Sequence, residues 1–198
     1  MKKTLGILGV ILIVGLIFYK FFVGFYNTGI VYQEDAKTAW SKVESAYQRR
    51  ADLIPNLVNT VKGYADHEKS TLEAVINARA SATQVKIDPS NITPDQMAKF
   101  QQAQQGLSGA LSRLLVSVER YPDLKADKNF LELQSQLEGT ENRIKIERDR
   151  FNDAVNRFNV HIKKFPGNML AGMFGFKEMA RFQADKGAES APKADFTK

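Results

Sequence analysis

The two histidines are the first residues to consider for chemistry, because this 198-residue chain has no cysteine. Neither His67 nor His161 has an acidic residue three positions before it, as the Glu-x-x-His pairs of di-iron bundles require. The stretch HEKST that begins at His67 also lacks the second histidine of a zinc-protease motif. We therefore interpret both as surface or interfacial histidines and expect no metal and no cofactor.

Catalytic motifs of other kinds are equally missing from the sequence. Without cysteine there is no thiol nucleophile and no disulfide. The serines have no nucleophile-elbow context, and no glycine-rich loop follows a predicted strand. We expect a protein that is not an enzyme.

A set of charged and amide side chains is the best candidate for a polar site. Glu68, Glu141 and Arg148 fall on or near the apolar stripes of predicted helices, where a lone buried charge would be costly. Pairing across helices would remove that cost and fix the helix register. The set could be a structural ion-pair network, or a ligand or proton-linked site. Its members are Arg49, Arg50, Asp52, Glu68, Glu141, Arg143, Arg148 and Asn152.

The overall charge argues against nucleic acid as a partner. The net charge is +6, from 28 Lys and Arg against 22 Asp and Glu, and basic residues alternate with acidic ones along most of the chain. This alternation is typical of solvated helix faces, whereas a nucleic-acid protein gathers basic residues into a stripe with interleaved aromatics.

The first 26 residues predict a membrane anchor. The stretch from Leu5 to Tyr26, broken only by Lys20, would make a helix of about 33 Å at about 1.5 Å per residue, enough to cross a bilayer. A cleaved signal peptide would need small residues at its cleavage site, where this chain has YKFFVGFYN. We expect an uncleaved single-pass anchor in the bacterial inner membrane, in contact with lipid through residues 5–26. Lys2 and Lys3 favour a cytoplasmic N-terminus, which places residues 27–198 outside the cytoplasm, although Lys20 and Lys37 on the other flank weaken this bias.

The rest of the chain reads as helix, with no convincing strand. Apolar residues at three-four spacing predict a helix over about 28–50, and Pro55 predicts a sharp turn before a second helix from Leu53. A third helix follows Thr93, which with Gln96 forms a predicted capping box, and ends before Pro122. A heptad stripe marks the fourth helix, ending at Pro166; its members are Phe130, Leu137, Ile144, Phe151, Phe158 and Phe165.

These elements predict an all-α fold: an N-terminal transmembrane helix followed by an elongated antiparallel four-helix bundle, up-down-up-down. We expect an anchor over 1–26, a bundle over 27–182 and a disordered tail over 183–198, which is poor in apolar residues. An even number of helices would return Phe165 to the membrane-proximal end.

The apolar element FPGNMLAGMFGF, residues 165–176, would then lie beside the bilayer. It could fold back as a plug on the end of the bundle, or it could contact the membrane or a partner through flexible glycines. The residues expected to make the membrane-proximal contact are Phe165, Met169, Leu170, Met173, Phe174 and Phe176.

Three segments resemble the LemA family of bacterial membrane proteins. They are AWSKVESAYQRRADLIPNLVNTVKGYADHEKSTLEAVINAR (39–79), LEGTENRIKIERDRFNDAVNRFN (137–159) and FPGNMLAGMFGF. The resemblance implies one N-terminal transmembrane helix, a helical soluble domain and no accepted enzymatic activity. It also implies a short N-terminus outside the cell, opposite to the orientation that the charges favour, and a loose association with envelope stress, membrane proteases and TPM-domain proteins.

The sequence therefore favours a membrane-anchored, non-enzymatic helical bundle that acts as a self-associating scaffold or adaptor in the cell envelope. We expect a homo-oligomer, with envelope or membrane-protease partners. The alternative is a sensor or regulator of a membrane protease or envelope-stress system, with its ligand site at the Arg/Glu cluster.

Overall fold

The structure, a computed structural model, describes residues 2–64 and 68–183. Its regular elements in this part of the chain are all helices, which confirms the all-α prediction. They are α1 (Lys2–Lys62), α2 (Lys69–Gln84), α3 (Pro94–Val118), α4 (Pro122–Lys125), α5 (Lys128–Lys163) and α6 (Gly167–Leu170).

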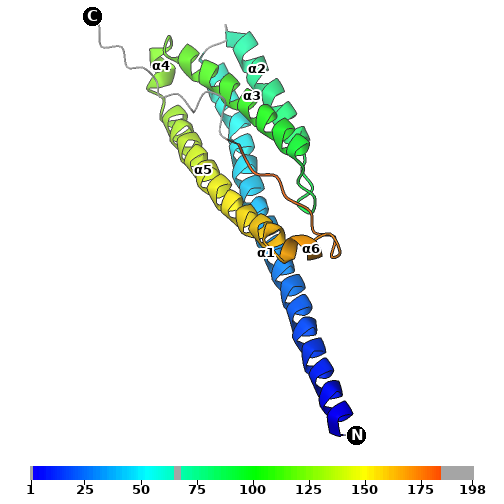
Figure 1. The fold of residues 1–198 in the computed structure, drawn as a ribbon. Helices are drawn as coiled ribbons and strands as arrows, with labels where there is room; N and C mark the ends of the chain where they lie inside the picture. The colour runs from blue at the N-terminus through cyan, green and yellow to red at the C-terminus, as the bar shows by residue number, and fades with distance from the viewer. Residues whose placement is uncertain (1, 65–67, 184–198) are drawn as a thin grey trace, which may run out of the picture.

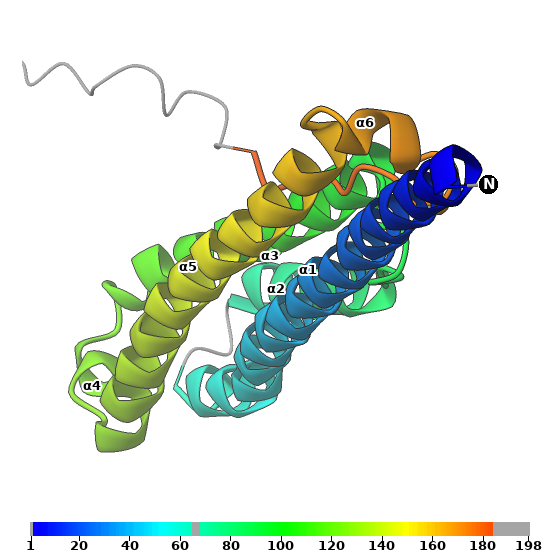
Figure 2. The ribbon, with the colours of Figure 1, turned by 60° about the horizontal axis from the view of Figure 1, so that its bottom comes forward.

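The helices form two pairs and alternate in direction (Figure 1). α1 packs against α5 along most of the length of α5, and α2 with α3 forms a shorter pair that contacts α1. The N-terminal half of α1 projects alone beyond the other helices in Figure 1, and this end of α1 comes forward in Figure 2. α6 lies where α5 ends, beside the point at which α1 leaves the domain (Figure 1).

The projecting half of α1 is long and apolar enough to cross a membrane, and its apolar side chains are exposed. Among the described helices it is the one that meets this test. This arrangement fits a single-pass membrane protein and agrees with the predicted anchor.

The predicted turn at Pro55 is wrong, because α1 continues through it to Lys62. A proline inside a helix leaves the carbonyl four residues earlier without its N–H partner. Here that carbonyl belongs to Ala51, and Arg79 of α2 donates its Nε–H to it at 2.7 Å. The Pro55 ring is exposed to solvent and takes no space from the core. The helix therefore continues past Pro55, and the chain turns only after Lys62.

The interior consists of two apolar clusters separated by a polar layer. The membrane-proximal cluster is aromatic and centres on Trp40, with Phe100 and Phe151 each 5.3 Å from its ring. The distal cluster is mostly aliphatic. The polar layer between them, one residue from each of three helices, consists of Arg50, Gln104 and Glu141.

The heptad stripe of α5 is buried as predicted, with one exception. Phe165 is 81% exposed, because α5 ends at Lys163 and Lys164 adopts an extended conformation. Phe165 therefore leaves the helical register and is not the last core residue of the stripe.

A C-terminal segment, residues 177–183, returns along α5 in extended form, and the sequence did not predict it. Asn159 bonds the backbone N–H and C=O of Met179, at 3.0 and 2.8 Å, and Asn152 bonds those of Phe182, at 2.9 and 3.2 Å. The Phe182 ring stacks on Trp40, 5.9 Å between centroids. The predicted tail beyond Gln183 lies outside the described residues.

Candidate functional site

The predicted Arg/Glu cluster does not form one site. Arg50, only 1% exposed, donates to Gln104 Oε1 at 2.7 Å and to Ser108 Oγ at 2.9 Å, and it pairs with Glu141. The side chain of Glu141 is 48% exposed at the edge of this layer. A buried guanidinium held by several acceptors on α3 and α5 fixes helix register, which supports the structural interpretation of these residues.

A cavity of about 210 Å³ lies beside the polar layer, and Arg50, Glu141 and Arg148 line it. Ligand pockets usually occupy roughly 300–1,000 Å³, so this one is small for an organic ligand. The predicted ligand site at this cluster therefore has little room.

The other members of the cluster lie apart. Glu68 is at the distal end of the domain, where Arg120 and Tyr121 donate to its Oε1 at 2.6 and 3.1 Å. Partial burial, and then the hydrogen bond to Glu68, raise the pKa of Tyr121. Asp52 accepts from Gln48 at 2.7 Å on the surface of α1.

Arg148 and Asn152 hold the C-terminal segment. The Arg148 guanidinium lies 4.6 Å from the centre of the Phe182 ring, and its Nη2 donates to Gln183 O at 3.4 Å. Asn152 bonds the backbone of Phe182, as described above. These contacts hold the extended C-terminal segment against α5.

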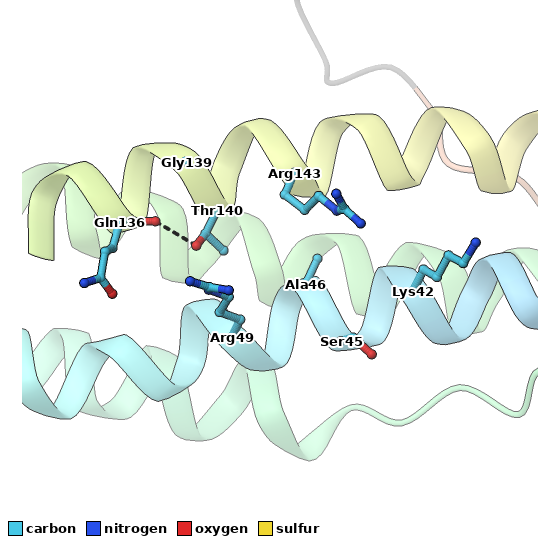
Figure 3. Close-up of a pocket in the computed structure, with 8 residues that line it drawn as sticks. All are labelled: Lys42, Ser45, Ala46, Arg49, Gln136, Gly139, Thr140 and Arg143. Carbon is cyan, nitrogen blue, oxygen red and sulfur yellow. Dashed lines mark hydrogen bonds between the residues drawn. The ribbon is translucent and has the colours of Figure 1, made fainter.

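Arg49 and Arg143, the two remaining members, share a cavity of about 720 Å³ between α1 and α5, which we call the basic groove (Figure 3). Figure 3 shows both side chains entering the same seam from opposite helices. The lining residues are Lys42, Ser45, Ala46 and Arg49 of α1, and Gln136, Gly139, Thr140 and Arg143 of α5.

Helical spacing explains why the groove forms at this place. Lys42 and Arg49 are seven residues apart and so lie on one face of α1, with Ala46 between them. Gln136 and Arg143 have the same spacing on α5, with Gly139 and Thr140 between. Because the central residues are small, the two helices leave a hollow between long polar side chains.

The charges around the groove do not balance. Arg143 pairs with Glu147 at 2.8 Å, but the buried Glu147 also accepts from Arg150 at 2.9 Å. Within residues 2–64 and 68–183, neither Lys42 nor Arg49 forms an ion pair. Three cationic groups therefore face the groove with one shared, buried carboxylate.

This arrangement suits binding of an anion. Guanidinium groups donate paired hydrogen bonds to carboxylates and phosphates, and charge strengthens such bonds. The Ser45 hydroxyl donates to Ser41 O at 2.8 Å, and the Thr140 hydroxyl donates to Gln136 O at 2.7 Å (Figure 3). Both hydroxyls are turned toward their own helices, and the residues that line the groove include no carboxylate and no imidazole.

Metal ligation finds no support in the described part of the chain, where no group of three His, Cys, Asp or Glu side chains could hold an ion. His161 Nε2 hydrogen-bonds to Phe25 O at 2.9 Å, and the two rings stack 4.4 Å apart. His161 is thus an interfacial histidine at the base of the domain. His67 lies outside the described residues.

The apolar element 165–176 has two sides. Leu170 and Phe176 are buried and Phe174 is half-buried, whereas Met169 and Met173 are exposed together with Phe165. The buried side closes the lower end of the core, as a plug would.

The sequence analysis did not identify two residues that set the charge at the groove. The spacing of Lys42, seven residues before Arg49, could have placed it on the same helix face, but lysines are common on the surfaces of helices. Glu147 was missed because it lies off the heptad stripe, yet it is only 1% exposed. Gly139 could have indicated the hollow only if the pairing of α1 with α5 had been known.

Comparison with known proteins supports the family resemblance of this sequence. The model of the LemA family matches residues 39–196. The chain belongs to the LemA family. The match includes the basic groove and the C-terminal segment, so both are built from sequence within the family region.

Relatives of this LemA-family member are named either magnetosome protein MamQ or protein LemA. Magnetosome protein MamQ 2 of Paramagnetospirillum magneticum is 29% identical over 184 residues, which covers 84% of this chain and 67% of the relative. Magnetosome protein MamQ of Magnetospirillum gryphiswaldense is also 29% identical over 184 residues, with the same coverage. Protein LemA of Metamycoplasma hominis is 27% identical over 185 residues, 93% of this chain and 80% of the relative. None of these is the name of an enzyme.

Proposed function

We propose that this LemA-family protein is a membrane-anchored, non-enzymatic adaptor that holds an acidic segment of a partner protein in its basic groove. The observation that carries the proposal is the charge imbalance at the groove, where Lys42 and Arg49 face Arg143 with one shared carboxylate nearby. A partner that brings carboxylates would balance these charges.

The continuity of α1 supports the proposed adaptor function. One uninterrupted helix includes the predicted anchor and one wall of the groove. At about 1.5 Å per residue, Lys42 stands roughly 24 Å beyond Tyr26, where the predicted span ends. The helix therefore presents the groove at a fixed height above the membrane, as a scaffold requires.

The shape of the groove favours a peptide over a compact ligand. A second hollow, lined by Leu53, Asn56 and Asn59 of α1 and by residues of α5 that include Glu132, begins where the first ends, and Gln136 lines both. The cationic part of the seam is therefore the basic groove itself. Together the two hollows follow the seam between the two helices over several turns. An elongated groove with a small-residue floor suits an extended or helical segment.

The partner classes that the sequence suggests are a second copy of this chain, another envelope protein and a membrane protease. Each would have to present acidic residues to the groove. We place the protein in the bacterial inner membrane with residues 27–198 outside the cytoplasm, because Lys2 and Lys3 precede the span. A cysteine introduced at the exposed Val116 should then react with a membrane-impermeant maleimide in intact cells. Lack of reaction in intact cells, with reaction in lysed cells, would reverse the orientation.

In-membrane photo-crosslinking from Gly139 tests the adaptor function. A photoreactive residue at this groove position should capture a specific acidic peptide, identified by mass spectrometry. Changing both Arg49 and Arg143 to Glu should abolish that capture. The control variant, Arg113→Glu, changes an exposed arginine of α3 that does not line the groove, and should leave capture intact. Capture that survives the double reversal would refute the proposed function, and crosslinks to this chain's own peptides would identify a second copy as the partner.

A further inference from the structure

The base of the domain has a cluster of exposed apolar side chains, which we call the basal edge. It consists of Phe165, Met169 and Met173, which are 81%, 68% and 74% exposed. Single exposed apolar side chains are common on soluble surfaces. Three large ones within one short segment, at the end of the domain where the membrane span begins, form a patch that points to an apolar partner.

Contacts with α1 fix the height of the basal edge. The Phe174 ring lies 6.4 Å from that of Phe22 and 5.2 Å from that of Tyr26, and Phe176 lies 5.9 Å from Tyr26. Gly167 packs so closely on Phe25 that an added Cβ would come within 2.6 Å of that ring. The segment is therefore held at the level of residues 22–26, the last part of the predicted span.

Basic side chains occur at the same level. Lys164 and Lys177 are exposed on either side of the element, and Lys20 is exposed on α1, two residues before Phe22. Aromatic and thioether side chains suit the boundary between headgroups and acyl chains, and lysines beside them suit anionic headgroups. This composition matches a bilayer surface.

We infer that the basal edge enters the interfacial layer of the same bilayer that α1 spans, while Phe174 and Phe176 stay packed on α1. We assign the bilayer as the partner of the basal edge because this edge adjoins the predicted span. The rings of Phe174 and Phe176, in the same segment, pack on Phe22 and Tyr26 of α1. The consequence is mechanical. A single helix can rotate about its own axis in the membrane, whereas a second point of insertion fixes the direction in which the domain faces. The inference does not depend on what the basic groove binds.

Depth-dependent quenching tests this inference on the full chain in vesicles of phosphatidylcholine and phosphatidylglycerol. The chain has no cysteine, so single labelling sites can be introduced at will. An environment-sensitive fluorophore on Met173→Cys should be quenched several-fold more strongly by lipids spin-labelled on the acyl chain than the same fluorophore on Val116→Cys. Val116 is the matched control, because it is 72% exposed and apolar but lies near the C-terminal end of α3, away from the base.

Equal quenching at the two positions would overturn the inference. If the fluorophore at position 173 were quenched neither by the spin-labelled lipids nor by a soluble aqueous quencher, the basal edge would be covered by a second copy, which would also overturn it. Replacing all three basal-edge residues with Ser should leave the melting temperature nearly unchanged, because they are exposed. A large decrease would mean that they stabilise the fold and do not contact lipid.

Discussion

The continuity of α1 through Pro55 depends on Arg79, and this dependence can be measured. The carbonyl of Ala51 has no N–H donor in its own helix, because Pro55 has none, and Ala51 is only 3% exposed. The Arg79 Nε–H, 2.7 Å away, takes that place. A double-mutant cycle between Pro55→Ala and Arg79→Ala isolates the substitution of one donor for the other.

The expected magnitude follows from the burial of the carbonyl. Leaving a buried acceptor without a partner costs about 1–3 kcal/mol, and the donor here is charged, so Arg79→Ala should lower the free energy of unfolding by about 2–3 kcal/mol. In the Pro55→Ala background, residue 55 supplies an N–H to Ala51. The same Arg79→Ala change should then cost about 1–2 kcal/mol less.

Urea unfolding of the full chain in detergent, followed by the fluorescence of Trp40, measures both values. Trp40 is the single tryptophan and is buried in the core, so its emission reports loss of the bundle. The exposed Arg113 provides a control, since Arg113→Ala should show no coupling to Pro55→Ala. If Arg79→Ala and Pro55→Ala were additive within about 0.5 kcal/mol, the account of the helix would be refuted.

Three further predictions concern the polar layer, the base and the start of α5. Arg50→Ala should lower the free energy of unfolding by about 2–4 kcal/mol, because it leaves the buried Gln104 Oε1 without its donor. Glu141→Gln should cost less than about 1 kcal/mol, since that side chain is half exposed, and chemical unfolding measures both values. Gly167→Ala should lower the melting temperature, because its Cβ would come within 2.6 Å of the His161 carbonyl oxygen, while Gly172→Ala, with open space around it, should not. The hydrogen bond from the Phe130 N–H holds the pKa of Asp127 below its ordinary value of 3.8. A lowered folded-state pKa stabilises the fold above the unfolded value and loses that contribution as pH falls through the folded value, so acid titration of the melting temperature should be flatter in Asp127→Asn than in the wild type.

Local sequence rules predicted the elements whose signals lie within a few residues. Thr93 and Gln96 form the expected capping box, with Thr93 Oγ1 accepting from the Gln96 N–H and the Gln96 side chain accepting from the Thr93 N–H. The α5 stripe from Phe130 to Phe158 is buried because a regular heptad leaves little choice of face. The same rules assigned Pro55 to a turn, because the donor that rescues the helix lies on another element.

The candidate site depended on pairings that the sequence does not state. The polar cluster was chosen as charged residues on apolar stripes, a criterion that finds Arg50 but not Glu147 or Lys42. Arg49 and Arg143 meet only because α1 packs on α5 in one register. The sequence also gave no sign of the C-terminal segment. Asn152 and Asn159 bond its backbone, and such bonds need no particular residue in the segment. The contact of Phe182 with Trp40 joins residues that are far apart in the sequence.

The most direct test of the adaptor function is rescue of crosslinking by charge exchange. Once the peptide captured from Gly139 is known, its acidic residues are changed to Lys and the partner variant is combined with the Arg49→Glu, Arg143→Glu chain in membranes. The account predicts that each change alone abolishes capture and that the two together restore it. Capture that is unaffected by either change, or lost without rescue in the combination, would contradict the claim that the basic groove recognises its partner through charge.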